Sequence, residues 1–175
     1  SYAISENNLN FLAAGEVVTA VFTITVNDQN GGTANQDVTV TLTGSNDAPT
    51  ITVVDVAGAI TEGAATLSDS GAITFADLDL SDRPTATEAT KSVSAKLADG
   101  ITTLVLSADQ QTAIANAFSI TNAVANTNNG TVTWDYTISE GNLDFLAAGE
   151  VVTAVFTITV NDQNGGTANQ DVTVT

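Results

Sequence analysis

The chain has 175 residues, 43% of them hydrophobic, so one domain with its own core plus a smaller piece is the natural division. It contains 20 acidic and 3 basic residues, a formal net charge of −17, and neither cysteine nor histidine. This balance argues against nucleic acid and anionic membranes, which bind through Lys and Arg, and it excludes disulfides and thiolate metal sites. Divalent cations that take oxygen ligands, Ca²⁺ above all, suit these side chains best.

One stretch occurs twice: residues 16–41 and residues 150–175 are identical, EVVTAVFTITVNDQNGGTANQDVTVT. The similarity continues upstream, so that position numbers in the two copies differ by 134 (Tyr136 against Tyr2). We therefore interpret the chain as a piece of a tandem array. Residues 1–41 would be the C-terminal part of one repeat, residues 42–49 a linker, and residues 50–175 a nearly complete second repeat.

The repeated stretch is predicted to form a β-hairpin. Alternate residues from Val152 to Val160 are apolar, the period of a half-buried strand, and Asn161–Gly166 supplies turn residues. The alternation then resumes at Val172. Residues 1–41 alone have too few strands to close a sandwich, so we expect them to be either loosely held or paired with an edge of the second unit or of another molecule.

After the linker, where Pro49 limits bending, a strand is expected to begin at Ile51. A Gly-punctuated turn region follows, then a strand around Ala72–Phe75. Next comes a loop that carries three aspartates and ends at Pro84. These aspartates are Asp77, Asp79 and Asp82.

The sequence after this loop predicts a half-buried strand around Val93–Leu97, continued by Ile101–Leu106, and then one helix. Ser107 with Gln110 makes a capping box at the start of that helix, which extends towards Phe118 with Ala113, Ile114 and Ala117 on one face. Ile120 is expected to start a short strand, and Asn126–Gly130 a turn.

The next strand alternates strongly, and its apolar residues Val132, Trp134, Tyr136 and Ile138 should point into the core. Trp134 and Tyr136 could instead form a sugar-binding platform, but on an alternating strand such residues are far more often core. Leu143–Leu146 is read as a crossing segment with one helical turn before the hairpin.

Seven or so short strands with turns between them and one inserted helix predict an all-β, immunoglobulin-like Greek-key sandwich. In this order, GSNDAP, ITEG, ITFADLDLSD, LDFLAAGE and FTITVNDQNGGTA resemble the VCBS or cadherin-like tandem repeats of large RTX-type bacterial adhesins. The inserted helix makes the unit longer than a typical repeat, and no nonapeptide RTX calcium repeat is present. The resemblance implies an extracellular protein at the bacterial surface.

In a Greek-key sandwich, the loop after the second strand and the turn of the last hairpin lie at the end where the chain enters. Asp77, Asp79 and Asp162 should therefore lie near Asn46 and Asp47, and together they can supply oxygens for Ca²⁺. The resemblance implies the same assignment, because cadherin-like domains clamp calcium between a linker and an Asp-x-Asp loop.

A second acidic group, Glu62, Glu140 and Glu150, is expected at the opposite end. The counterparts of Glu140 and Glu150 in the preceding unit, Glu6 and Glu16, should face the linker. One group of ions would then be shared by successive units. The full set of candidate cation ligands is Asp77, Asp79, Asp82, Asp162, Asn46, Asp47, Glu62, Glu6, Glu16, Glu140, Glu150 and Asp28, the last being the counterpart of Asp162.

These features favour a calcium-stabilised spacer module that holds a distal adhesive domain away from the bacterial surface for attachment or biofilm formation. The partners would be neighbouring repeats and calcium ions. The alternative is a module that binds sugar or protein ligands through calcium. An enzyme is disfavoured, because the common nucleophile and base arrangements need His or Cys.

Overall fold

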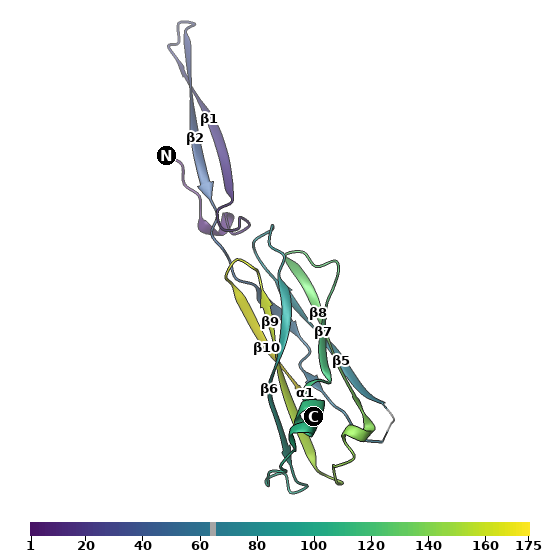
Figure 1. Ribbon diagram of the computed structural model, residues 1–175. Coiled ribbons are helices and arrows are strands. Elements are labelled where there is room, and N and C mark those ends of the chain that lie inside the picture. The colour runs from purple at the N-terminus through teal and green to yellow at the C-terminus, as the bar shows by residue number, and fades with distance from the viewer. Residues whose placement is uncertain (64–65) are drawn as a thin grey trace.

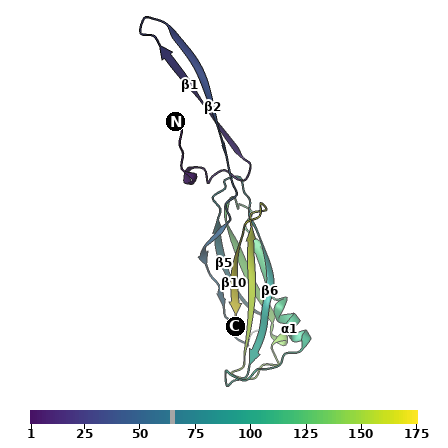
Figure 2. The same ribbon diagram turned by 90° about the vertical axis from the view of Figure 1, so that its left-hand side faces the viewer.

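The computed structural model describes residues 1–63 and 66–175, which form a two-stranded hairpin followed by a β-sandwich (Figure 1). The hairpin consists of β1 (Val17–Asn27) and β2 (Thr33–Thr43), preceded by a single 3-10 turn, η1 (Glu6–Asn8). It projects beyond one end of the sandwich, which makes the molecule elongated (Figure 2).

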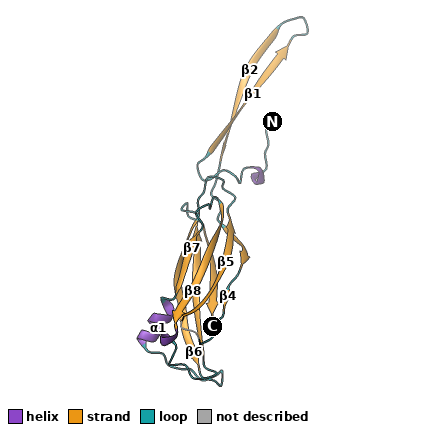
Figure 3. Ribbon diagram, turned by 90° about the vertical axis from the view of Figure 1, so that its right-hand side faces the viewer, coloured by secondary structure: helices purple, strands orange, loops and turns teal. Residues whose placement is uncertain are grey.

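The sandwich has two sheets of four strands each, with one short helix at their flank (Figure 3). One sheet has the order β3-β5-β8-β7 and the other the order β4-β10-β9-β6. Neighbouring strands are antiparallel except β4, which pairs parallel to β10. The elements are β3 (Thr50–Val54), β4 (Ala57–Gly58), β5 (Thr66–Ala76), β6 (Thr85–Lys96), α1 (Ala108–Ala115), β7 (Phe118–Asn122), β8 (Asn129–Ser139), η2 (Glu140–Asn142), β9 (Val151–Asn161) and β10 (Thr167–Val174).

This strand order confirms the predicted immunoglobulin-like sandwich. The first edge strand is divided between the two sheets, β3 in one and β4 in the other. The chain then crosses between the sheets from β5 to β6, from β6 to β7 and from β8 to β9, which is a Greek-key arrangement. The two ends of the sandwich are therefore built from loops, and the β5–β6 loop and the β9–β10 turn lie at the same end, as predicted.

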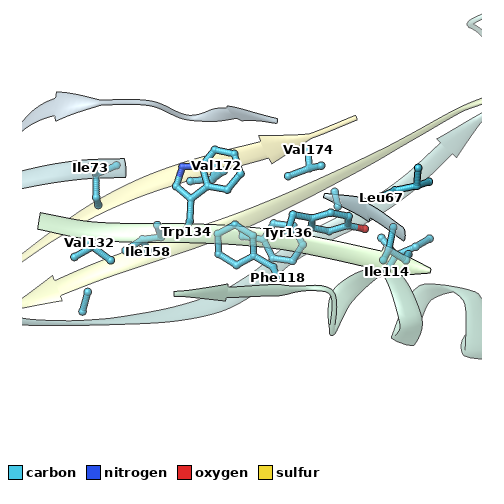
Figure 4. Packing of buried hydrophobic residues seen from close by; sticks show 14 of the residues in the cluster. Leu67, Ile73, Ile114, Phe118, Val132, Trp134, Tyr136, Ile158, Val172 and Val174 are labelled. Atoms are coloured by element: carbon cyan, nitrogen blue, oxygen red, sulfur yellow. The ribbon is translucent and has the colours of Figure 1, made fainter. Parts of the chain in front are cut away.

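The core lies between the sheets, where alternate residues of β8 and β9 meet. Trp134 and Tyr136 are buried, and their rings lie near that of Phe118 (Figure 4). The Phe118 ring stacks on Phe156 with 4.1 Å between ring centroids. The indole N–H of Trp134 donates to the carbonyl oxygen of Asp55 at 2.6 Å. Both aromatic residues of β8 are thus core residues, and neither forms an exposed platform.

The structure corrects the sequence prediction in two places. Ile101–Leu106 is not a strand: it makes one isolated bridge between Lys96 and Thr103 and leaves Ile101 and Val105 exposed. β5 already begins at Thr66, inside the region read as a turn. Gly71 lies within that strand, and a Cβ there would be 2.7 Å from the Trp134 ring, so this glycine marks close packing and no turn.

The predicted helix is confirmed, although it is shorter than expected. Ser107 accepts the backbone N–H of Gln110, and the Gln110 side chain accepts the N–H of Ser107. Ile114 is the buried residue on its inner face. The helix crosses from β6 to β7 at the end of the sandwich farthest from the hairpin (Figure 3).

The base of the N-terminal hairpin contacts both the segment that connects it to the sandwich and the sandwich itself. Gly44 N–H donates to the carbonyl oxygen of Glu16 at 2.8 Å, and Leu80 N–H donates to that of Phe11 at 3.2 Å. Leu12 is buried there, and a Cβ on Gly44 would overlap the Leu12 carbonyl oxygen. This close approach requires glycine at the junction.

Candidate metal centre

Four aspartates converge at the end of the sandwich that faces the hairpin. Three come from the β5–β6 loop and one from the β9–β10 turn, and all are buried: Asp77 is 3% exposed, Asp79 0%, Asp82 4% and Asp162 1%. The sequence predicted that Asp77, Asp79 and Asp162 would meet, and Asp82, a candidate ligand from the same loop, lies with them. Four buried carboxylates in one place are exceptional, because ionised groups lose hydration on burial.

Local hydrogen bonds hold these carboxylates in position. Asp162 Oδ1 accepts the backbone N–H of Asn164 at 2.7 Å and that of Gly166 at 2.9 Å, which closes the hairpin turn. Asp77 Oδ1 accepts the N–H of Asp79 at 3.0 Å. Such Asp-to-backbone bonds two residues ahead are typical of turns, and they fix the position of both carboxylates.

The segment between β2 and β3 joins the cluster. Asp47 N–H donates to Asp79 Oδ2 at 2.8 Å, and the Asn46 amide donates to Asp162 Oδ2 at 2.9 Å. The Asn164 amide donates to Asp82 Oδ1 at 2.8 Å. The loop, the last turn and the connecting segment are thus tied together, as the sequence predicted for Asn46 and Asp47.

Several oxygens in this group have no hydrogen-bond partner among the described residues although they are buried: Asp77 Oδ2, Asp79 Oδ1, Asp82 Oδ2 and Asn46 Oδ1. An unpartnered buried acceptor destabilises the folded state, so the presence of these atoms requires a structural explanation. One carboxylate oxygen from each of Asp77, Asp82 and Asp162 lies within 4.8 Å of the other two. Oxygens about 2.3–2.6 Å from one Ca²⁺ ion fall within such a span.

The protein's own basic residues do not neutralise the cluster. Arg83 is adjacent in sequence, but its guanidinium donates to the carbonyl oxygens of Leu80 and Asp82. Lys91 pairs with Asp171, and Lys96 donates to the carbonyl oxygen of Ile101. These are the only three basic residues in the chain.

The electrostatics of the cluster reflect this lack of a counter-charge. Burial raises the pKa of Asp77, and the charges of Asp82, Asp79 and Asp162 raise it further against one backbone hydrogen bond. Burial also raises the pKa of Asp79, with Asp82, Asp47 and Glu16 as its charged neighbours.

Asp162 differs from the other members of the cluster. Burial alone would raise its pKa, but hydrogen bonds from Asn46 and from the backbone of the turn outweigh burial, so its pKa lies below the ordinary value. At neutral pH it is therefore a carboxylate whose oxygens are already oriented.

Glu16 brings the hairpin into the same neighbourhood. Its Oε2 accepts the backbone N–H of Ala13 at 3.0 Å, which fixes the bend before β1, and its charge acts on Asp79. Glu6 lies on the exposed turn η1, and within residues 1–63 and 66–175 no hydrogen bond joins its side chain to the cluster.

Asp28 lies at the far tip of β1–β2, away from the sandwich (Figure 1). It closes its own turn by accepting the N–H of Asn30 at 2.8 Å and that of Gly32 at 2.8 Å. These hydrogen bonds lower its pKa. It has the local geometry of Asp162 without the rest of the cluster.

A second, exposed acidic group forms at the opposite end of the sandwich from Glu62, Glu140 and Asp144. Glu140 Oε2 accepts the backbone N–H of Gly63 at 3.1 Å. Glu150, expected in this group, accepts the N–H of Ala147 at 2.9 Å. Asp144 was missed by sequence reasoning, although it is one of the few positions where the copies differ, standing opposite Asn10.

A cavity of about 500 Å³ lies near this opposite end. Its lining is mostly apolar and includes Ile60, Leu143 and Val174. Burial raises the pKa of Tyr136, which also lines it, to about 12, so this hydroxyl stays protonated at neutral pH. The cavity is separate from the aspartate cluster.

No family model matches the chain, and no curated protein matches it. Among solved structures it is similar to CfaE, the adhesive subunit of the CFA/I fimbria of enterotoxigenic Escherichia coli, with 15% identity and a TM-score of 0.44. The alignment covers 96% of this chain and 59% of that subunit, so the chain spans less than two thirds of its length. This likeness carries no argument about function.

No helix in residues 1–63 or 66–175 has the length and apolar character needed to cross a membrane.

Proposed function

We propose that the aspartate cluster binds Ca²⁺ and that the ion locks the hairpin unit to the sandwich, making the chain a stiff spacer in a surface adhesin. The observation that carries this proposal is the set of buried oxygens without partners, contributed by Asp77, Asp79, Asp82 and Asn46. A cation would satisfy these atoms and neutralise the buried charge together.

The donor set favours Ca²⁺ over other metals. The chain lacks the imidazole and thiolate ligands that zinc and copper prefer. Mg²⁺ keeps several waters in a strict octahedron, whereas Ca²⁺ accepts six to eight oxygens in flexible geometry. A buried group with several carboxylates and an amide oxygen suits the larger ion better.

The location of the cluster supports a mechanical role. The candidate ligands come from the connecting segment (Asn46, Asp47), the β5–β6 loop and the β9–β10 turn, with Glu16 of the hairpin beside Asp79. An ion held by these elements would restrict bending where the hairpin joins the sandwich. Bound metal at many such junctions would keep a long array extended.

The repeated sequence supports the assignment to a spacer. The identity of residues 16–41 and 150–175 is what a length-setting array requires, since a specialised binding site needs only one copy. The motif resemblance to VCBS or cadherin-like repeats agrees with such a role in an extracellular adhesin at the bacterial surface.

Calcium titration of the full chain tests the metal centre, with thermal unfolding and calorimetry as readouts. Calcium at about a hundred times its dissociation constant should add roughly 2.7 kcal/mol per site to the free energy of unfolding. Asp162→Asn should abolish most of this gain. Asp28→Asn makes the same change in the identical turn outside the cluster, and it should leave calcium binding intact.

Two outcomes would contradict this assignment: equal melting temperatures in calcium and in chelator, or equal losses in Asp162→Asn and Asp28→Asn. The spacer role has a separate test, small-angle X-ray scattering of the same samples. Removing calcium should broaden the distribution of intramolecular distances, because the hairpin can then bend relative to the sandwich. An unchanged distribution would reject the mechanical role even if the ion binds.

A further inference from the structure

The β1–β2 hairpin exposes residues whose counterparts in β9–β10 lie in the core of the sandwich. Phe22 is 45% exposed, Ile24 53% and Val26 64%, and Val38 on β2 is 41% exposed. A soluble protein rarely presents so many large apolar side chains on one element without covering them. Tyr2 contacts Phe22, with 5.6 Å between ring centroids, but leaves the face open.

The same residues in β9–β10 show what covers such a face. Phe156, Ile158, Val160 and Val172, the counterparts of these four residues, are at most 1% exposed. They lie in one core cluster with side chains from residues 51–143, among them Phe118, whose ring stacks on Phe156 at 4.1 Å, and Tyr136, whose ring centroid is 6.1 Å from that of Phe156. An interface for this amino-acid sequence therefore already exists inside the molecule.

The outer edges of the two hairpins differ in the same way as their side chains. In the sandwich, β6 pairs with the outer edge of β9 along its whole length, and β4 pairs with the outer edge of β10. β1 and β2 form a sheet of only two strands, so within the described part of the chain their outer edges have no partner strand. Open edges bind added strands readily.

Polar residues of β9–β10 contact β6 and its flanking loop, whereas within the described ranges the same residues in β1–β2 lack these partners. Asp171 on β10 pairs with Lys91 on β6, and its counterpart Asp37 has no lysine beside it among the described residues. In the β9–β10 turn, the Gln163 amide donates to Thr85 Oγ1 at 2.9 Å. The counterpart of Gln163, Gln29, is at the exposed tip of β1–β2 with the same positive φ.

We propose that the apolar face of β1–β2 is a docking site for a polypeptide with the sequence of residues 42–134, which lacks a hairpin of its own. That segment supplies the counterparts of β3 to β7 and the first half of β8. Residues 1–5 complete β8 in the complex, because Tyr2 and Ile4 are the counterparts of Tyr136 and Ile138. The product is a second complete sandwich, and its formation does not require a metal.

The test mixes the full 175-residue chain with a tagged polypeptide of residues 42–134 and measures complex formation by size-exclusion chromatography with light scattering. We expect a 1:1 complex. Phe22→Asp with Ile24→Asp in the full chain should abolish it. Val21→Asp with Thr25→Asp adds the same charge on the opposite face of β1 and should leave binding largely intact.

Binding that persists in the Phe22→Asp, Ile24→Asp chain would show that the polypeptide displaces β9–β10, and it would overturn the proposal. Self-association of the full chain that those substitutions abolish would also overturn it, because a second hairpin would then cover the face.

If the isolated polypeptide aggregates, a second protein tests the proposal. In it, a copy of residues 42–134 is fused directly before Ser1 of the full chain. This chain should show two buried tryptophans, seen as blue-shifted emission from both. A solvent-exposed added tryptophan, together with no complex in the first experiment, overturns the inference. Complex formation is measured both in calcium and in chelator. Equal complex formation in the two would support the docking site even if the proposed metal centre is wrong.

Discussion

The hairpins β1–β2 and β9–β10 share one sequence from Glu16 and Glu150 onwards, yet their surroundings are opposite. Phe22 is 45% exposed where Phe156 is 1% exposed, and Ile24 is 53% exposed where Ile158 is fully buried. The strands nevertheless cover equivalent residues, and the tight turn has the same Asp-to-backbone bonds in both. Local structure here follows from local sequence, whereas burial depends on what the rest of the chain supplies.

The comparison also separates two kinds of aspartate. In the isolated turn, hydrogen bonds from the backbone lower the pKa of Asp28. The junction adds three further aspartates to the equivalent turn, and burial raises the pKa of two of them, Asp77 and Asp79. The turn alone makes an ordinary surface carboxylate, and only assembly of the junction makes a candidate cation site.

The largest difference should come from the two phenylalanines. Phe156→Ala should destabilise the sandwich by about 3–5 kcal/mol, because it empties a packed core position beside Phe118. Phe22→Ala removes an exposed side chain and should cost the sandwich less than about 0.5 kcal/mol. Denaturant unfolding followed by Trp134 fluorescence measures both, and similar losses would mean that the first hairpin is packed in solution.

An intermediate effect is expected from acidification without calcium. Asp77 and Asp79 have raised pKa values in the folded chain, so between the unfolded and folded values the native state binds more protons. Stability should therefore rise as pH falls from 7 through these folded pKa values, by up to about 1.4 kcal/mol per pH unit for each group. Melting curves in chelator measure it.

In saturating calcium the sign of this pH dependence should reverse, because protons then compete with the ion for the same oxygens. Asp79→Asn supplies the control, since it removes one of the two groups and should flatten the rise seen in chelator. A chelated wild-type protein that loses stability steadily from pH 7 to about pH 5 would contradict the assignment of buried, uncompensated carboxylates.

The smallest effect should come from the paired surface aspartates. Asp171→Asn removes the ion pair with Lys91 and should cost about 0.2–1 kcal/mol, because both side chains are partly exposed. Asp37→Asn should leave sandwich stability unchanged. Lys91 and Thr157 lower the pKa of Asp171, so the wild-type advantage is present above the unfolded pKa and lost as pH falls through the folded one.

Thermal unfolding at pH 7 and again at acid pH tests this last prediction in one series. The gap between wild type and Asp171→Asn should close at acid pH, while Asp37→Asn should overlay wild type throughout. A gap that stays constant with pH would assign the loss to the Thr157 hydroxyl contact alone, which also exists between Thr23 and Asp37.

Short-range patterns were sufficient for most of the fold. The alternation in β8 and β9, the capping box of α1 and the turn chemistry at Asn161–Gly166 each depend on neighbours a few residues apart, and all were read correctly. The errors arose where a distant residue decides the outcome. Gly71 has the sequence character of a turn residue, but it lies in β5, where the Trp134 ring packs against it. Ile101–Leu106 has the composition of a strand, but it pairs with the end of β6 only through the isolated bridge between Lys96 and Thr103.

Part of the candidate site could likewise be predicted from the sequence, and part could not. Greek-key topology was enough to bring Asp77, Asp79 and Asp162 to one end with Asn46 and Asp47, because strand order determines which loops meet. It could not show that Glu16 lies beside Asp79 while Glu6 stays exposed, or that Asp144 replaces Glu150 in the second acidic group. Those pairings depend on side-chain directions within loops.

The amino-acid sequence alone specifies the duplicated hairpin, the geometry of its turn and the excess of carboxylates, because these are local or compositional properties. Which copy of the hairpin is buried, and which carboxylates become a cluster, was decided only when strands distant in sequence packed together. The physical reason is that burial and unmet charge belong to the contacts between segments, and an identical segment has no means of specifying its neighbours.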